Sequence, residues 1–409
     1  MKVLWLTTCP CGSINRNGNN QLFGGWIFSL EKELKKEKDI ELNVAYFSQN
    51  EHKPFSFDGV NYYPIYRSKW DNLLMRIKGK HSSNIIAECN SIIQKVSPDL
   101  IHIHGTEHPF PLIVTHTNIP TVISMQSILA AYVDKYYSGI PKNIANHYDS
   151  MKLKLLFLGS KAMYKLTFNT ARNELEAFKH LKYIIGRTNW DYSISRLAAP
   201  TSIYYKCDEI LRDEFYQNTW KRHQHKNIIL ATTMSDSIYK GLDVVYNTAK
   251  ILKHFGIKFT WLIIGQKTGS NYDRITRKYT NINPEEVNVS LLGRKNSQEI
   301  IKILLDADVF IQTSHIENSP NSLCEAMLLG MPIIASCVGG TNSLITDRKE
   351  GVLVQEGDCY SYASIIVEAM THQEEMAEYG KNARQRALIR HNKSRIVQQV
   401  LHCYKDMIH

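Results

Sequence analysis

Hydrophobic residues occur along the chain in short runs that alternate with segments of helical periodicity. In the first half, the expected strands contain continuous apolar runs such as 3–6 and 44–47, as expected of strands that are buried on both faces of a parallel sheet. Between them, 85–96 repeats apolar residues at helical spacing. This alternation predicts a doubly wound α/β domain. The strands expected in this half are 2–8, 41–47, 99–104, 121–125 and 183–186, with a helix that begins near Gly25.

The same rhythm starts again after residues 200–210. The strands expected in the second half are 227–232, 259–264, 287–292, 309–313 and 332–336, and its helices include 242–255, 297–305, 373–390 and 394–407. Because 409 residues are too many for one ordinary core, we expect two domains, 1–205 and 206–391, with a C-terminal helix (392–409) that completes the first. Ligands of such sheets bind in a crevice at the carboxyl ends of the strands.

Residues 315–336 read HIENSPNSLCEAMLLGMPIIAS and predict a loop, a helix and a strand. Ser322 and Glu325 have the spacing of a capping box, and Gly330 fits the helix C-terminus. Either Glu317 or Glu325 alone is typical of a solvated loop or a helix cap. Together they flank a helix N-terminus, which attracts anions, while carboxylates accept hydrogen bonds from hydroxyls. A sugar nucleotide combines both properties.

Three other loops carry candidate binding groups. Gly24 and Gly25 precede a helix, where glycine lets a phosphate approach backbone N–H groups, although paired glycines often serve only a turn. Lys240 stands before another helix and can neutralise a diphosphate or simply be solvated. In DLIHIHGTEHP (99–109), a structural role is expected for His102, and the loop residues Glu107 and His108 are functional candidates.

The composition is that of a globular protein, with 43% hydrophobic and 22% charged residues. No apolar run reaches the length of a transmembrane helix, and the apolar part of MKVLWLTTCPCGS is too short for a signal peptide. We therefore expect a cytoplasmic location. The eight cysteines form no CxxC pair, which favours unconnected thiols over a zinc site.

The net charge of +10 calls for an anionic partner. No nucleic-acid-binding motif is present. The stretch 151–172 (MKLKLLFLGSKAMYKLTFNTAR) carries five cations and no acid. Its interleaved apolar residues suit a helix on the surface of an anionic membrane. A core helix with lysines along its edges is equally compatible with this pattern.

Several of these segments resemble the retaining glycosyltransferases of family 4, bacterial cell-surface polysaccharide enzymes included. The resemblance is strongest over 227–365, in YKGLDVV, LLGRKNSQEIIKILLDADVFIQTS and ENSPNSLCEAMLLGMPIIASCVGG, and extends to QLFGGWIFSLEKEL and PDLIHIHGTEHPF. It implies the GT-B fold, in which two Rossmann-like domains with parallel sheets face each other across a deep cleft. It also implies transfer of a hexose from a nucleotide-diphosphate sugar to a glycan or lipid-linked glycan, with retention of configuration.

The resemblance also implies roles for individual residues. Glu317 would hydrogen-bond the donor sugar near its anomeric carbon, and Glu325 the ribose hydroxyls. Lys240 and the backbone N–H groups of Asn321, Ser322 and Leu323 would contact the diphosphate, which Gly24 and Gly25 would approach from the other domain. The remaining implied or expected site residues are Gly293 and Arg294 beside the base, and Gln126, Glu107 and His108 on the acceptor side.

Some positions depart from the family pattern. Met234 and Ser235 stand where an arginine is frequent, Gln126 where a histidine is frequent, and the glutamate after the later Gly-Gly is replaced near 341–343. No Asp-x-Asp triad appears in a likely donor loop, so we expect no cofactor and no required metal. A GT-B epimerase, a phosphorylase or a non-catalytic sugar-nucleotide-binding protein remains an alternative. Peripheral attachment to the inner face of the cell membrane is a further expectation.

Overall fold

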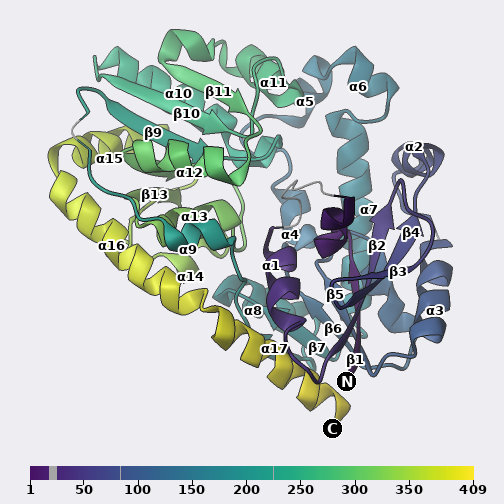
Figure 1. The fold of residues 1–409 in the computed structure, drawn as a ribbon. Coiled ribbons are helices and arrows are strands. Elements are labelled where there is room, and N and C mark those ends of the chain that lie inside the picture. The colour runs from purple at the N-terminus through teal and green to yellow at the C-terminus, as the bar shows by residue number, and fades with distance from the viewer. Residues whose placement is uncertain (18–24, 83, 224) are drawn as a thin grey trace. The chain divides into compact units, whose positions relative to one another are not determined.

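The computed structural model describes residues 1–17, 25–82, 84–223 and 225–409. They divide into two compact units, which are drawn in Figure 1. Unit 1 contains 1–134, 152–211 and 391–409, and unit 2 contains 135–151 and 212–390. The chain therefore crosses between units after residues 134, 151, 211 and 390, whereas the sequence-based division places its boundaries after 205 and 391.

Unit 1 is built on one sheet of the order β3-β4-β2-β1-β5-β6-β7-β8. Neighbouring strands pair in parallel except β3 and β4, which are antiparallel. The strands are β1 (Lys2–Thr7), β2 (Glu41–Ser48), β3 (Phe55–Phe57), β4 (Val60–Tyr66), β5 (Leu100–His104), β6 (Thr121–Ser124), β7 (Tyr183–Gly186) and β8 (Ile203–Lys206). The central strands β1 and β5 are buried over nearly their whole length, as parallel pairing between layers of helices requires.

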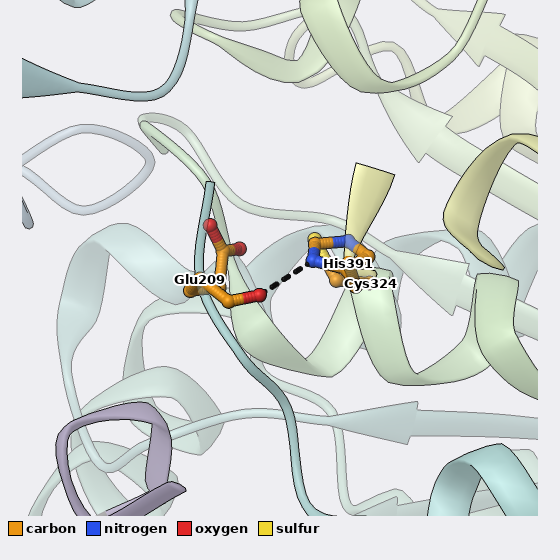
Figure 2. Close-up of side chains that lie close together, drawn as sticks. All are labelled: Glu209, Cys324 and His391. Carbon is orange, nitrogen blue, oxygen red and sulfur yellow. Dashed lines mark hydrogen bonds between the residues drawn. The ribbon is translucent and has the colours of Figure 1, made fainter. Parts of the chain in front are cut away.

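The helices of unit 1 are η1 (Cys11–Asn17), α1 (Gly25–Leu34), α2 (Lys69–Lys78), α3 (Asn84–Val96), η2 (Phe110–Thr115), α4 (Leu129–Asp134), α6 (Met151–Leu155, which starts on the last residue of the unit 2 segment), α7 (Ser160–Phe178), α8 (Asn189–Ala198) and α17 (Lys393–Ile408). Helix α17 packs its apolar side into the same core as β1 and β2. The Tyr404 hydroxyl accepts a hydrogen bond from Trp5 Nε1 at 3.0 Å. At the start of this last segment, His391 Nδ1 lies 2.8 Å from the backbone oxygen of Glu209 (Figure 2). Cys324, drawn in the same figure, belongs to unit 2.

Unit 2 contains a fully parallel sheet of the order β11-β10-β9-β12-β13-β14. Its strands are β9 (Ile228–Thr233), β10 (Phe259–Ile264), β11 (Val289–Gly293), β12 (Val309–Gln312), β13 (Ile333–Ser336) and β14 (Val352–Val354). Its helices are α5 (Lys142–Tyr148), α9 (Asp213–Gln217), η3 (Ile238–Lys240), α10 (Leu242–His254), α11 (Asn271–Thr280), η4 (Pro284–Val287), α12 (Ser297–Asp306), α13 (Asn321–Leu329), α14 (Thr341–Leu344), α15 (Cys359–Thr371) and α16 (Gln373–Arg390). The strand predicted over 287–292 begins two residues later, because η4 occupies 284–287.

The short segment 135–151 comes from the first half of the sequence but packs in unit 2. Ile140 and Ala145 share a small core with Ile238 and Ile275, and Arg274 donates to the backbone oxygen of Tyr148 at 2.8 Å. Lys135 forms an ion pair of 2.7 Å with Glu356. This segment therefore supports η3, the turn that ends at Lys240.

All eight cysteines are free thiols, as the absence of paired motifs predicts. Within the described residues, no helix combines the length and the hydrophobicity needed to cross a bilayer.

Candidate functional site

The carboxyl edge of the unit 2 sheet brings Lys240 and Glu317 together. Lys240 Nζ lies 2.5 Å from Glu317 Oε1, and the Ser314 hydroxyl donates to the same oxygen at 2.8 Å. Glu317 is buried, with 5% of its surface exposed. Burial alone would lower the pKa of Lys240, but the Glu317 carboxylate outweighs it and the pKa is raised. Lys240 is thus held in its charged form.

The backbone around this pair is fixed by contacts between three loops. The His315 amide donates to the Tyr239 carbonyl at 2.8 Å, and the Gly340 amide donates to the Glu317 carbonyl at 2.9 Å. Gly241 has φ of 79°, and a Cβ there would collide with the Thr313 carbonyl. Gly339 has φ of 48°, and a Cβ there would collide with the Glu317 carbonyl. Only glycine fits either position without strain, so Glu317 stands in a preorganised loop.

Helix α13 begins differently from the prediction. Its N-cap is Pro320, and no side chain caps it, so the predicted capping box of Ser322 and Glu325 is wrong. The Leu323 amide, one of the three expected to face the diphosphate, donates to the Pro320 carbonyl at 3.0 Å. Ser322 is a residue of the first turn, where its backbone N–H still belongs to the polarised helix N-terminus. Gly330 ends the helix in the left-handed conformation, as predicted.

Both oxygens of Glu325 are held by an arginine that the sequence analysis missed. Arg212 Nε and Nη2 each lie 2.7 Å from one Glu325 oxygen, in a bidentate pair, and Arg212 Nη1 donates to the Ser297 hydroxyl at 2.9 Å. Burial raises the pKa of Glu325, although Arg212 acts in the opposite direction. This pairing replaces the capping box. Nothing in the local pattern marks Arg212, because its partner is 113 residues away.

His315 forms a second charge cluster next to Glu317. Its ring nitrogens lie 3.2 Å from Asp243 Oδ1 and 3.1 Å from Glu356 Oε1. Burial would lower the pKa of His315, but the two carboxylates more than compensate and raise it. Since Glu356 also pairs with Lys135, the cluster links the Glu317 loop to the inserted segment.

The residues expected beside the base lie at the end of β11. Gly293 has φ of 69° at the strand end, and Arg294 is exposed. Lys295 Nζ lies 3.4 Å from Glu299. Arg294 is therefore accessible to a ligand, and Lys295 shares its charge with a neighbouring helix.

The unit 1 candidates lie on loops after β5 and β6 and at the start of α1. Gly25 is the first residue of α1 with φ of 45°, while Gly24 lies outside the described residues. Gln126 is exposed directly after β6. Glu107 accepts hydrogen bonds from the Thr106 amide at 2.9 Å and the Ser127 amide at 3.1 Å, and from the Ser127 hydroxyl. It joins the two loops instead of pointing at solvent.

The three histidines of this region are buried. His102 contacts the Tyr404 and Ser124 hydroxyls, both at 2.6 Å, which is the structural position expected of it. His108 is 3% exposed and its Nε2 lies 2.9 Å from the His104 carbonyl. Burial lowers the pKa of His108 to about 4. His108 is thus a neutral residue of the interior, and Gln126 is the accessible side chain.

The basic stretch 151–172 is two helices, not one. Helix α6 ends at Leu155, and the chain turns through Phe157, with φ of 53°, before α7 begins at Ser160. The exposed apolar residues of the stretch are Met151, Leu155, Leu156, Phe157 and Phe168. The core-helix alternative applies to Leu166 and Ala171, which are buried.

An Asp-x-Asp pattern does exist at Asp306-Ala307-Asp308, but at the wrong edge of the sheet for a donor site. It precedes β12, whereas Glu317 follows that strand. Asp308 accepts hydrogen bonds from the Ile229 amide at 2.7 Å and from His225 at 3.1 Å. A pocket lined by Trp220, His225 and Pro332, among others, lies at this same amino edge. Because open α/β sheets bind ligands at the carboxyl edge, we assign the site to the Glu317 loop.

Part of the chain matches a known protein family. The glycosyl transferases group 1 family matches residues 215–386. The amylovoran biosynthesis glycosyltransferase AmsK of Erwinia amylovora is 31% identical over 151 residues, which are 36% of this chain and 36% of AmsK. The UDP-Gal:alpha-D-GlcNAc-diphosphoundecaprenol alpha-1,3-galactosyltransferase of Escherichia coli is 30% identical over 118 residues, or 29% and 30% of the two chains. The matches thus span about a third of each relative's length.

The likeness of fold extends over the whole chain. HepE of Anabaena, solved in complex with UDP and glucose, aligns with 99% of this chain and 100% of its own at a TM-score of 0.66 and 16% identity. Two α/β units with largely parallel sheets define the GT-B class of glycosyltransferase folds. Residues 215–386 of the chain are thus similar to the glycosyl transferases group 1 family, and the whole chain shares its fold with GT-B proteins.

Proposed function

We propose that the chain is a retaining glycosyltransferase that transfers a hexose from a nucleotide-diphosphate sugar to a hydroxyl of a lipid-linked glycan in cell-surface polysaccharide synthesis. The observation that carries this proposal is the charged pair of Lys240 and Glu317, held at 2.5 Å beside the N-terminus of α13. The relatives support it, since one is named for amylovoran biosynthesis and another for a UDP-galactose donor and a diphosphoundecaprenol-linked acceptor.

Each group has a defined task in the transfer. The bond between the anomeric carbon and the diphosphate oxygen breaks, and negative charge develops on the leaving diphosphate. Lys240 has three N–H donors, of which Glu317 occupies one, so it can also contact the diphosphate. Helix N-terminal amides add further stabilisation. The acceptor oxygen bonds to the anomeric carbon on the same face, and its proton passes to the departing phosphate oxygen.

Glu317 and Glu325 orient the donor. Glu317, with one oxygen bound by Lys240 and Ser314, presents its other oxygen to the sugar hydroxyls. Each Glu325 oxygen accepts one hydrogen bond from Arg212 and keeps a lone pair for a ribose hydroxyl. On unit 1, Gln126 would hydrogen-bond a sugar hydroxyl, while Glu107 would position the acceptor through the loop that it holds.

Membrane attachment is part of the proposal. The cations Lys152, Lys161, Lys165 and Arg172 are exposed, and near anionic lipid each contributes up to about 1 kcal/mol. Leu155 and Phe168 are exposed beside them. We therefore propose that 151–172 binds the cytoplasmic face of the membrane, where a lipid-linked acceptor would lie.

The test combines donor binding with product analysis. A thermal-shift panel of UDP, GDP and other nucleotides identifies the donor class. Incubation of the matching nucleotide sugars with a lipid-linked acceptor extract should then yield a glycoside with the donor's anomeric configuration. An epimerised donor or a sugar phosphate would instead indicate an epimerase or a phosphorylase. Nucleotide binding without turnover of any donor would indicate a binding protein.

A further inference from the structure

Helix α2 exposes an apolar stripe. The exposed fractions are 72% for Trp70, 44% for Leu74 and 42% for Ile77. These residues are spaced i, i+4 and i+7, so they lie on one side of the helix. No residue of α2 is buried. A tryptophan and two aliphatic residues in one exposed row form the kind of apolar surface that soluble proteins use for binding.

The charges around this stripe are almost all positive. Residues 69–80 contain Lys69, Arg76, Lys78 and Lys80 against a single acid, Asp71. The Asp71 carboxylate is used within the helix cap, where it accepts a hydrogen bond from the Ser68 amide at 2.9 Å. An anionic surface would therefore meet four cations and a carboxylate that already has local donors.

Helix α2 is fastened to α7, which carries part of the basic stretch (Figure 1). Asn169 Nδ2 donates to the carbonyl of Gly79, the C-cap of α2, at 2.6 Å. The stem of Lys165 also lies against Gly79. On α7 the exposed residues Lys161, Lys165, Phe168 and Arg172 follow one another at spacings of four, three and four, which places them along one side of that helix.

We propose that α2 is the element of this enzyme that enters the bilayer. Trp70, Leu74 and Ile77 would reach the boundary between headgroups and acyl chains, while Lys69, Lys78 and Lys80 lie at the level of the lipid phosphates. The proposal rests on the membrane attachment proposed above and adds to it a second, more apolar helix. A second copy of the chain is a poorer partner, because pairing α2 with itself would bring two sets of cations together.

Vesicle sedimentation tests this role. Wild type should pellet with phosphatidylcholine vesicles that contain phosphatidylglycerol and remain soluble with phosphatidylcholine alone, with less pelleting as salt rises. The triple variant Trp70→Ser, Leu74→Ser and Ile77→Ser should weaken partitioning about tenfold or more, because three partly inserted apolar side chains are lost. The matched control is Leu197→Ser on α8 of unit 1, where Leu197 is 84% exposed; it should pellet like wild type.

A charge variant separates the two contributions. Replacement of Lys69, Lys78 and Lys80 by glutamine should reduce pelleting at low salt and flatten its salt dependence. The control replaces Lys250 and Lys258, which are exposed on unit 2, by glutamine and should have neither effect. Pelleting of the apolar triple variant at the wild-type level would overturn the role of α2. An equal loss of pelleting in the Leu197→Ser control would also overturn it. Self-association of the wild type that the triple variant abolishes would do the same.

The design distinguishes this proposal from the broader ones. The quadruple variant replaces Lys152, Lys154, Lys161 and Lys165 by glutamine. If it abolishes pelleting while the α2 variants do not, attachment through 151–172 stands and the role of α2 fails. If wild type stays in the supernatant, both membrane proposals fail. Nucleotide thermal shifts, measured without vesicles, should be the same in every variant and report separately on the fold and the donor site.

Discussion

Several glutamates of the two units differ in the groups that hold them. In unit 2, Glu317 and Glu325 are paired with Lys240 and Arg212. In unit 1, Glu209 pairs with Arg187 at 3.5 Å, but three other glutamates, Glu31, Glu107 and Glu174, accept hydrogen bonds from neutral donors. Glu31 accepts from the Gly12 amide and the Tyr62 hydroxyl, both at 3.0 Å.

Glu107 and Glu174 follow the unit 1 pattern. Glu107 binds the Ser127 amide, and Glu174 binds the Leu129 and Ala130 amides at 3.0 and 2.9 Å. Neutral donors fix loops but leave a charge uncompensated, whereas cation pairs keep a site charged and ready for an anion. The comparison therefore agrees with the donor role proposed for the unit 2 glutamates, and it shows that Glu107 and Glu174 hold loops of unit 1.

The largest expected effect separates Glu317 from Glu107. Glu317→Gln and Lys240→Ala should each reduce transfer at least ~100-fold, the scale of one lost charged contact in a transition state. Glu107→Gln should retain most activity, because an amide oxygen can still accept from Ser127. Steady-state rates with donor and acceptor measure this. Full activity of Lys240→Ala would show that the diphosphate is neutralised elsewhere.

The next effect concerns the buried carboxyl group of Glu31 in unit 1. Burial raises the pKa of Glu31 from 4.5 to about 7, so the folded state favours the protonated acid. The contribution of Glu31 to stability should therefore fall by about 3 kcal/mol as pH rises from 4.5 through 7. In denaturant unfolding, the stability of Glu31→Gln relative to wild type should rise by this amount over the same range, because Glu174, whose pKa burial also raises to about 7, titrates alike in both proteins. Asp39 is an exposed acid of the same unit, so the difference between Asp39→Asn and wild type should not change with pH. A pH-independent difference for Glu31→Gln would contradict the assignment.

A smaller effect is expected at Arg212. Lysine keeps the charge but cannot form the bidentate pair with Glu325, so Arg212→Lys should raise the donor KM about tenfold, the scale of one charge-assisted hydrogen bond, and change kcat much less. Arg277 also pairs with a carboxylate of unit 2, Glu285, at 3.0 Å, and Arg277→Lys should leave the donor KM unaltered. Equal effects at the two positions would indicate a general loss of stability and not a role in ribose binding.

The last prediction is that removal of metal ions does not change the rate of transfer. If the diphosphate charge is balanced by Lys240 and helix amides, EDTA should leave transfer unchanged. Rate measurements in EDTA, with manganese or magnesium added back, provide the check. If activity is lost in EDTA and a metal restores it, the diphosphate charge is not balanced by protein cations alone.

The sequence predicts those parts of the fold that depend on neighbours in the chain. Strands β9, β10 and β12 are buried parallel strands and appear as continuous apolar runs. The helix α13 is predicted, but its cap is not, because a long-range pair between Arg212 and Glu325 competes with the local Ser322–Glu325 motif. The residence of 135–151 in unit 2 depends on partners such as Arg274, 126 residues from Tyr148, and no local pattern encodes it.

The site residues also divide into those that local sequence predicts and those that depend on distant contacts. Glu317 and Lys240 are recognisable from motif spacing, and the structure brings them into contact. The buried state of His108 and the loop contacts of Glu107 depend on the packing of β5 and β6, which alternation alone does not reveal. The exposed stripe of helix α2 is not recognisable from the sequence either, since an apolar stripe normally indicates a buried face. Only its exposure in the structure marks it as a surface element.

The four crossings of the chain between units have a consequence for synthesis on the ribosome. Unit 2 has its full complement of residues once Arg390 has left the ribosome, but unit 1 still waits for the last segment, 391–409. Until α17 arrives, Trp5 lacks its hydroxyl partner Tyr404, and the core beneath β1 is open. The half that is translated first is therefore the half that finishes folding last. A nascent chain stalled just before α17 should keep unit 2 protected from protease while unit 1 is cut.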